Sequence, residues 1–389
     1  MKRQDAQWLC CQLGAREHYA VPRALQTRGL LRELMTDLWI RPGTLPKLRN
    51  KLTARFHADL AAVRVSAPNI AALAFEFKAQ ATRLNGWDLI TKRNDWFQDH
   101  VLAQLKRRAS ELRRGSMTVF AYSYAADRIF KYARERGWRT VLGQIDPGPA
   151  EEKRVGGSIP APENYWRQWH NECNLADQIV VNSEWSRDAL LKEGLPANKI
   201  RIIPLAMEPS KDAALFRRVY PPAFDAARPL RVLFLGQINH RKGAAQLLEA
   251  ARLVADEPIE FWFVGPKQIR TDLQGESKIK WFGAVPRAEV DRFYREADVF
   301  ILPTLSDGFG LTQLEAQSWK LPVVVSPFCG AVIQHGRNGL ILDQVSGNAI
   351  AAALRELLES PARLAAMAQE SRVNDEFTLK SLASSLSQL

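Results

Sequence analysis

The sequence has few cysteines and no pattern that would join them. Its 389 residues include Cys10, Cys11, Cys173 and Cys329, without a CxxC pair, even spacing or a histidine at metal-ligand spacing. These absences argue against a disulfide framework and against a zinc site. We therefore expect the protein to work in a reducing cytosol.

Long hydrophobic runs are also missing. No stretch of 18 or more apolar residues occurs, which argues against a membrane-spanning helix. The apolar stretch at 8–11 that follows Met1-Lys2-Arg3 is far too short for a signal peptide. The expected location is the cytoplasm, with peripheral contact at the inner face of the membrane as an alternative.

Basic residues, in contrast, are plentiful and unevenly distributed. Residues 1–150 carry 26 Lys and Arg against 13 Asp and Glu, a formal charge of +13, whereas residues 151–389 carry 28 against 29, a charge of −1. The densest cluster runs from Lys106 to Arg108 and on to Arg113 and Arg114. It predicts either a solvated helix face or contact with an anionic membrane or acceptor. Nucleic acid is disfavoured, because no recognition module or RNA-binding pattern is found.

Length and composition predict two globular domains with a cleft between them. In the first half, a strand-like run at 7–12 ends near a glycine and precedes a helical stretch near residue 20, which is how a doubly wound fold begins. Further strands are predicted at 117–122, 140–145 and 178–182, with helices over 40–115, at 127–137 and at 185–193, and a loop over 147–162.

The second half repeats this alternation. Strands are predicted at 230–236, 260–265, 280–283, 298–303 and 322–325, with helices at 244–255, 287–297 and 311–319. Such alternation predicts parallel sheets covered by helices on both faces. The polar, proline-bearing segment 208–229 is the expected linker between domains 1–207 and 230–389, and the last helix has the option of packing back on the first domain.

One candidate binding segment is the loop before the helix at 311–319. Its glycines allow the backbone to approach a ligand closely, and the amides at the helix start suit a diphosphate. Asp307 precedes the helix and Glu315 lies about one turn inside it, so both are placed to accept hydrogen bonds from sugar hydroxyls. The residues expected around the anion are Gly308, Phe309, Gly310, Leu311 and Thr312.

A second candidate segment runs from Gly236 and Gln237 to Gly243. It is not a Walker A loop, because the spacing is wrong and no Ser or Thr follows the lysine. The adjacent cations Arg241 and Lys242 at a helix start are unfavourable against the helix dipole unless an anion comes to them. The alternative is a basic, solvated turn.

These two segments resemble the GT-B-fold retaining glycosyltransferases of family four, of the group 1 type. Asp307-x7-Glu315 keeps the spacing of the family's E-x7-E region, with Asp in place of the first Glu. The resemblance implies that Glu315 holds the ribose, Asp307 the donor sugar and Lys242 the diphosphate. Gln237 replaces the family's arginine, and Arg241 is the expected substitute.

Other positions extend the resemblance. Gly265 matches a strand-end glycine, and Val285 and Pro286 match the segment whose backbone contacts the base. On the acceptor side, Gly14 matches the first-loop glycine. Many members have a His-Asp pair where this chain has Ile145 and Asp146, and His18 is a candidate to replace that histidine in space.

The resemblance implies a GT-B fold, an α/β architecture in which two Rossmann-like, doubly wound parallel sheets face a central cleft. It implies transfer from a UDP- or GDP-sugar to a glycan or lipid-linked acceptor, with retention of configuration, in polysaccharide or glycolipid synthesis. The expected catalytic residues are Asp307, Glu315, Lys242 and Arg241. Because cations and amides take the leaving-group charge and no DxD motif occurs, we expect no metal and no cofactor besides the donor substrate.

Two other functions stay open. A nucleotide-sugar epimerase of the same fold would need acid and base residues in the cleft that the sequence does not identify. A non-catalytic nucleotide-sugar-binding protein is the other alternative, because Asp307, Gln237 and Ile145 all depart from the family pattern.

Overall fold

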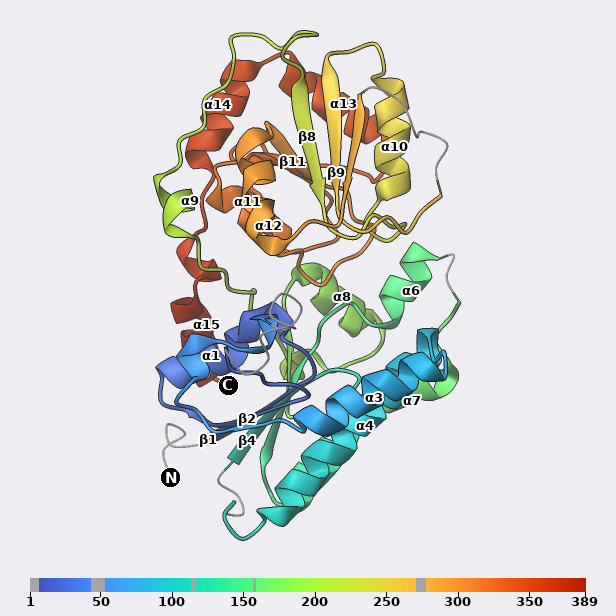
Figure 1. Cartoon of the computed structure of the whole chain (residues 1–389), viewed down its shortest axis with the longest axis vertical. Coiled ribbons are helices and arrows are strands. Elements are labelled where there is room, and N and C mark those ends of the chain that lie inside the picture. Colours follow the sequence, from blue (N-terminus) through green and yellow to red (C-terminus); the bar gives the residue numbers. More distant parts are fainter. Residues whose placement is uncertain (1–6, 43–52, 113–116, 157–158, 271–277) are drawn as a thin grey trace.

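A computed structural model describes residues 7–42, 53–112, 117–156, 159–270 and 278–389. It contains two parallel sheets, one in each half of the chain, stacked along the long axis of the molecule (Figure 1). The predicted fold class, two doubly wound α/β domains, is confirmed.

The first sheet has seven strands in the order β3-β2-β1-β4-β5-β6-β7, all paired in parallel. The strands are β1 (Gln7–Gln12), β2 (Leu31–Thr36), β3 (Val65–Ser66), β4 (Met117–Tyr122), β5 (Arg139–Gly143), β6 (Gln178–Val181) and β7 (Ile200–Ile202). The helices of this half are α1 (Ala20–Thr27), α3 (Asn69–Ala81), α4 (Gly86–Arg107), α5 (Asp127–Glu135), α6 (Pro149–Val155), α7 (Glu163–Leu175) and α8 (Glu184–Lys192).

Both faces of this sheet are buried, because successive residues of a strand point to opposite sides. Leu9 and Cys11 of β1 join the core that includes α4, α5 and α7. Trp8 and Cys10 join the opposite core, which includes α1 and also α15 (Leu379–Ser387) from the end of the chain. The last helix therefore packs on the first domain.

The second sheet has six strands in the order β10-β9-β8-β11-β12-β13. They are β8 (Leu230–Leu235), β9 (Ile259–Val264), β10 (Ile279–Gly283), β11 (Val299–Leu302), β12 (Val323–Val325) and β13 (Gly339–Ile341). The covering helices are α10 (Ala244–Leu253), α11 (Arg287–Glu296), α12 (Thr312–Ser318), α13 (Gly347–Leu358) and α14 (Pro361–Glu370). In chain order, α9 (Lys211–Leu215) follows the first sheet and precedes the second, in the segment predicted as a linker.

The structure differs from the local predictions in the following places. β2, β3 and β13 are strands that the sequence did not predict, and the segment predicted as a loop over 147–162 contains α6. This helix has Pro149 at its first turn, Glu151 and Glu152 near its start and basic residues in its last turn, all of which stabilise a helix. In the predicted linker, the Ser210 side chain caps α9 by accepting a hydrogen bond from the Ala213 N–H.

The basic cluster is not a uniformly solvated face. Lys106 and Arg107 are exposed at the end of α4, but the Arg108 side chain is only 5% exposed and pairs with Glu33 and Glu111. Arg113 and Arg114 lie outside the described residues. Within those residues, no helix combines the length and apolar character needed to span a bilayer.

Candidate active site

The two segments singled out in the second half meet at one point. The loop after β8 carries Lys242, and the loop after β11 carries Asp307. The Lys242 ammonium donates a hydrogen bond to the Asp307 carboxylate, and both side chains are about 85% buried. Burial would raise the pKa of Asp307, but Lys242 and Arg241 outweigh it and hold that pKa below its usual range. The site therefore contains an ionised acid directly beside two cations.

Arg241 links this pair to the first domain. Its guanidinium donates a hydrogen bond of 3.2 Å to the Ser306 carbonyl and lies 3.8 Å from a carboxylate oxygen of Glu151 on α6. Arg154 at the end of the same helix donates to the Leu305 carbonyl at 2.7 Å. α6 thus contacts the loop that carries Asp307.

Glycines allow the strand-end loops to pack this closely. A Cβ atom on Gly243 would lie 1.8 Å from the Pro303 carbonyl oxygen, and one on Gly265 would lie 1.9 Å from the Gly236 carbonyl oxygen. No side chain fits at either position. Gln237, beside Gly236, is exposed and accepts a 3.3 Å hydrogen bond from the Asn239 amide.

The loop 308–310 packs against residues of both domains and is not fully open to solvent. A Cβ atom on Gly308 would lie 2.0 Å from the Ile145 carbonyl oxygen of the first domain, and one on Gly310 would lie 2.7 Å from the Leu302 side chain. Phe309 is 2% exposed within the second-domain core, so only its backbone is available to a ligand. The glycines expected for ligand approach thus have a packing role as well.

Glu315 faces a cavity of about 280 Å³ between the domains. Its carboxylate accepts a 2.8 Å hydrogen bond from the Tyr294 hydroxyl and a 3.3 Å bond from Arg287. Leu311 also lines this cavity, whereas Thr312 is half-buried at the start of α12. Val285 is half-buried and Pro286 exposed, directly before α11.

The first domain contributes a strained turn to the same cavity. Glu17, His18 and Tyr19 follow one another with φ of 50°, 52° and 61°, a left-handed conformation that costs about 1–2 kcal/mol for each non-glycine residue. The Tyr122 hydroxyl holds Glu17 with a 2.8 Å hydrogen bond. Burial and the nearby Arg287 lower the pKa of His18, so it is neutral at pH 7.

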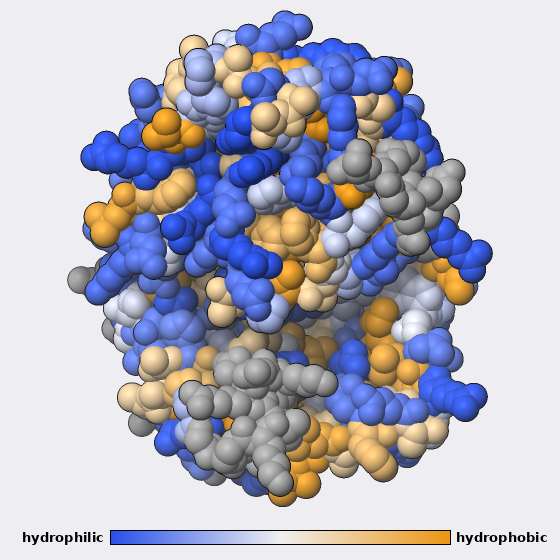
Figure 2. Space-filling model, turned by 45° about the horizontal axis from the view of Figure 1, so that its top comes forward, coloured by the Kyte–Doolittle hydropathy of each residue, from blue (hydrophilic) through white to orange (hydrophobic). Residues whose placement is uncertain are grey.

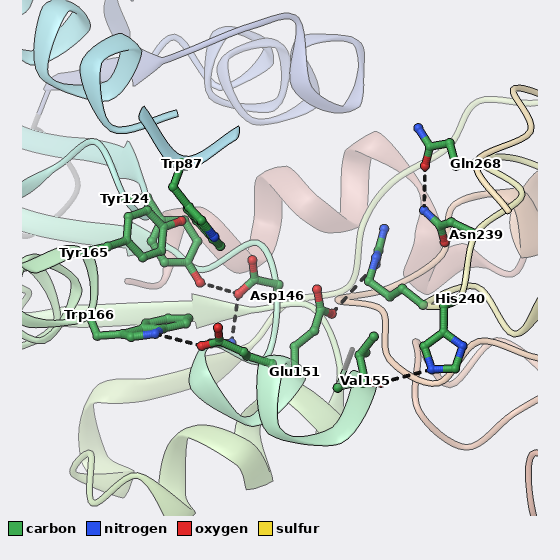
Figure 3. Close-up of a pocket in the computed structure, with 14 residues that line it drawn as sticks. Trp87, Tyr124, Asp146, Glu151, Val155, Tyr165, Trp166, Asn239, His240 and Gln268 are labelled. Atoms are coloured by element: carbon green, nitrogen blue, oxygen red, sulfur yellow. Dashed lines mark hydrogen bonds and ion pairs between the residues drawn. The ribbon is translucent and has the colours of Figure 1, made fainter. Parts of the chain in front are cut away.

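A larger cavity, about 700 Å³, is lined in part by α6 and has aromatic side chains along one wall (Figure 3). The Tyr124 and Tyr165 rings stack with centroids 4.9 Å apart, and Trp87 and Trp166 lie beside them. Asn239, His240 and Gln268 of the second domain form the opposite wall. His240 approaches the Val155 carbonyl at 3.1 Å.

Acidic side chains project into this aromatic cavity. Asp146 accepts hydrogen bonds from the Tyr124 hydroxyl at 2.5 Å and from the Gly148 N–H at 2.8 Å. Burial raises the pKa of Glu151 to about 7, and the neighbouring Asp146 adds to this effect. Glu152 accepts a 2.9 Å hydrogen bond from the Trp166 indole.

Some of the predicted site residues line one of these two cavities. His18 lies in the cavity that Glu315 lines, whereas Asp146 lies in the aromatic one. Gly14 has φ of 82° and donates its N–H to Asp37 at 2.9 Å. Among the described residues, no group of three or more His, Cys, Asp or Glu side chains is placed to hold a metal ion.

Sequence reasoning missed the aromatic wall and Glu151. Trp87 lies at the start of α4, and Tyr165 and Trp166 lie on α7, where single aromatic residues in helices predict only a core. Glu151 lies in the segment that the sequence predicts as a loop and that the structure shows to be helix α6. The acidic first turn after Pro149 is the signal that would have revealed α6.

Part of the chain is similar in sequence to known glycosyltransferases. Residues 229–360 match the family model described as "Glycosyl transferases group 1". The amylovoran biosynthesis glycosyltransferase AmsK of Erwinia amylovora is 29% identical over 235 residues, which cover 54% of this chain and 56% of that protein. A D-inositol 3-phosphate glycosyltransferase of Kineococcus radiotolerans is 31% identical over 249 residues, with 54% and 56% covered. The chain thus spans little more than half the length of these relatives.

Solved structures show the same fold over nearly the whole chain. Sucrose-phosphate synthase from Thermosynechococcus elongatus has a TM-score of 0.69 at 17% identity and covers 98% of both chains. The catalytic domain of starch synthase IV from Arabidopsis thaliana has a TM-score of 0.71 at 11% identity, with 99% of this chain and 98% of that one covered.

The topology and the solved structures together show a GT-B fold, with two parallel-sheet domains. In sequence, the second half of the chain is similar to the group 1 glycosyltransferases over residues 229–360, and this match includes Lys242, Asp307 and Glu315. The resemblance inferred from the sequence is confirmed.

Proposed function

We propose that the protein transfers a sugar from a nucleotide diphosphate sugar to a glycan acceptor, with retention of configuration and without a metal ion. The observation that carries the proposal is the buried Lys242–Asp307 pair beside Arg241, which lines the aromatic cavity. Two cations and one ionised acid suit a diphosphate with an attached sugar.

The donor fits the second domain. Lys242 and Arg241 are placed to bind the diphosphate, where they stabilise the charge that grows on the leaving group. Asp307 accepts hydrogen bonds from hydroxyls of the donor sugar, and Glu315 accepts them from the ribose. A related fold supports this donor class, since a structure of HepE from Anabaena contains UDP-glucose (TM-score 0.60, 16% identity, 99% of this chain and 100% of that one covered).

The acceptor fits the aromatic cavity. Ring faces of Trp87, Tyr165 and Trp166 suit the apolar faces of a sugar, and the carboxylates of Glu151 and Glu152 suit its hydroxyls. A cavity of about 700 Å³ has room for one or more sugar units. We place the protein in polysaccharide or glycolipid synthesis in the cytoplasm, at the inner face of the membrane.

The test is nucleotide release from a panel of UDP- and GDP-sugars, with and without acceptor sugars, in the presence of a chelator. Transfer to an acceptor that persists in chelator supports the proposal. Loss of transfer in chelator, restored by magnesium or manganese, would refute metal independence. Conversion of the donor to its epimer, or tight donor binding without release or transfer, would instead support the epimerase or the binding protein.

A further inference from the structure

Helix α3 exposes its large hydrophobic side chains to solvent and buries small ones. Its buried positions are Ala72 and Ala79. In contrast, Ile70 is 86% exposed, Phe77 is 75% exposed and Leu73 is 44% exposed. A surface helix normally turns such residues toward the core.

These exposed residues form one continuous stripe. Positions 70, 73 and 77 follow the spacing of a single helix face, and Ala74 and Ala81 are exposed on the same face. Single exposed hydrophobic residues are common, but an aligned row of them marks an interaction surface. We call Ile70, Leu73 and Phe77 the α3 stripe.

The exposure of the stripe does not come from a loose helix. The Asn69 amide makes two hydrogen bonds to the Trp39 backbone, at 2.8 and 2.9 Å. Phe75 packs on Trp96 with ring centroids 5.3 Å apart. Glu76 accepts two hydrogen bonds of 2.9 Å from Arg93. The inner face of α3 is therefore fixed on α4, and these contacts hold the stripe toward solvent.

The helix that carries the stripe is joined by a short turn to one wall of the aromatic cavity. Trp87, which lines that cavity, follows α3 after a short turn, and its indole donates a 2.9 Å hydrogen bond to the carbonyl of Ile159, itself 80% exposed. α3 and α4 run along the outer edge of the first domain (Figure 1). The space-filling view shows hydrophobic side chains on the lower half of the molecule, beside the hollow between the halves (Figure 2).

Charge favours one kind of partner. Lys78 on α3, Arg83 in the turn after it and Lys92 on α4 are exposed, against exposed Asp88 and the already paired Glu76. The first 150 residues carry a formal charge of +13. A second copy of the chain would bring the same basic residues face to face, whereas an anionic lipid surface attracts them while accepting apolar side chains.

We propose that the α3 stripe docks the protein on an anionic lipid bilayer, with the mouth of the aromatic cavity next to the membrane. This rests on the proposed function in one respect: the acceptor would be a lipid-linked sugar, whose sugar part enters the cavity while its lipid stays in the bilayer. The depth of insertion is that of an interfacial helix, which lies in the headgroup region without spanning the membrane.

The experiment is flotation with vesicles of phosphatidylcholine, alone or with about 30% phosphatidylglycerol, at roughly 50 and 500 mM salt. We expect binding to the anionic vesicles that weakens about tenfold at the higher salt, and little binding to the neutral ones. Ile70→Ser/Leu73→Ser/Phe77→Ser should weaken binding at least about tenfold, because three side chains lose their burial in lipid.

The matched control is the double variant Leu215→Ser/Val219→Ser. These two residues are 82% and 85% exposed and lie in the chain segment that connects the two domains. The double variant should bind vesicles like the parent. Vesicle binding by the triple variant equal to that of the parent, or no binding by the parent, would overturn the proposal. The proposal would also be overturned if light scattering showed that the parent is a dimer and that the triple variant is a monomer that still binds vesicles.

The vesicles contain no sugar acceptor, so this result does not depend on transferase activity. Nucleotide binding by the triple variant should equal that of the parent, which separates a docking defect from misfolding. If docking is confirmed and no sugar is transferred to any acceptor, the membrane surface stands and the transferase proposal fails.

Discussion

At the scale of single residues, the site depends on the direct pairing of Lys242 with Asp307. The lysine keeps a largely buried carboxylate ionised, and the carboxylate orients the ammonium. A diphosphate in this position would share Lys242 with Asp307. The two residues should therefore affect nucleotide binding and sugar transfer in different proportions.

Lys242→Ala should weaken nucleotide diphosphate binding and slow transfer by roughly 100-fold or more, the scale for losing one preorganised donor to developing charge. Steady-state kinetics and nucleotide titration measure the two effects. Lys267→Ala removes an exposed lysine on the same domain and should have little effect. Unchanged kinetics in folded Lys242→Ala would show that the lysine does not contact the leaving group.

The two acids should separate in kinetics. Glu315→Ala should chiefly raise the donor KM, because ribose contacts act alike in the ground and transition states. Asp307→Ala and Asp307→Glu should chiefly lower kcat for the native sugar, since the longer Glu side chain disturbs the contact with Lys242. If both Asp307 variants transfer that sugar at the parent rate, Asp307 is not a ligand of the donor sugar.

At the scale of elements, α6 couples the two domains. Arg154 stacks on the Phe328 ring at 3.2 Å from its centroid and donates to the Leu305 carbonyl, while Glu151 approaches Arg241. These contacts hold the segment directly before Asp307. A seven-residue helix of the first domain thus supports the loop of the second domain that carries Asp307.

Glu151 should make stability depend on pH. Its pKa is about 7 in the native state and about 4.5 when unfolded, because burial favours its protonated form. The stability that this proton binding contributes is complete below about pH 4.5 and is lost as pH rises through 7. In the parent, the free energy of unfolding measured in urea should therefore fall by about 1–3 kcal/mol between pH 5 and 8, and Glu151→Gln should remove this fall.

The exposed Glu163→Gln is the control for this measurement, since it neutralises an acid at the start of the next helix. It should leave the pH dependence of the unfolding free energy as in the parent. A Glu151→Gln protein with the parent's pH dependence would mean that Glu151 titrates as an ordinary exposed acid.

At the scale of the whole molecule, the domains meet backbone to backbone. Gly308 packs so closely on Ile145 that a Cβ atom would lie 2.0 Å from its carbonyl oxygen. The Trp185 indole also donates to the Ser306 hydroxyl at 3.1 Å across the cleft. The C-terminal helix α15 packs on α1, which ties the chain end to the first domain.

Gly308→Ala should therefore force the domains apart. We expect transfer to fall about tenfold or more, because misplacing groups by about 1 Å costs up to 100-fold in rate. Nucleotide binding to the second domain should change much less. Small-angle scattering should show a larger radius of gyration. A variant with parental scattering and parental transfer would mean that the Ile145 contact is not needed for catalysis.

The sequence by itself determined most of the local structure and the resemblance to the group 1 glycosyltransferases. Periodicity, glycines and helix caps act over a few residues, so the strand–glycine–helix order and the Asp307-x7-Glu315 spacing were readable without coordinates. Only the tertiary structure decided which distant side chains meet. Lys242 and Asp307 are 65 positions apart, and Glu151 reaches Arg241 from the other domain. The same holds for α3: its composition indicates a helix, but only the packing of neighbouring elements determines which face is left for a partner.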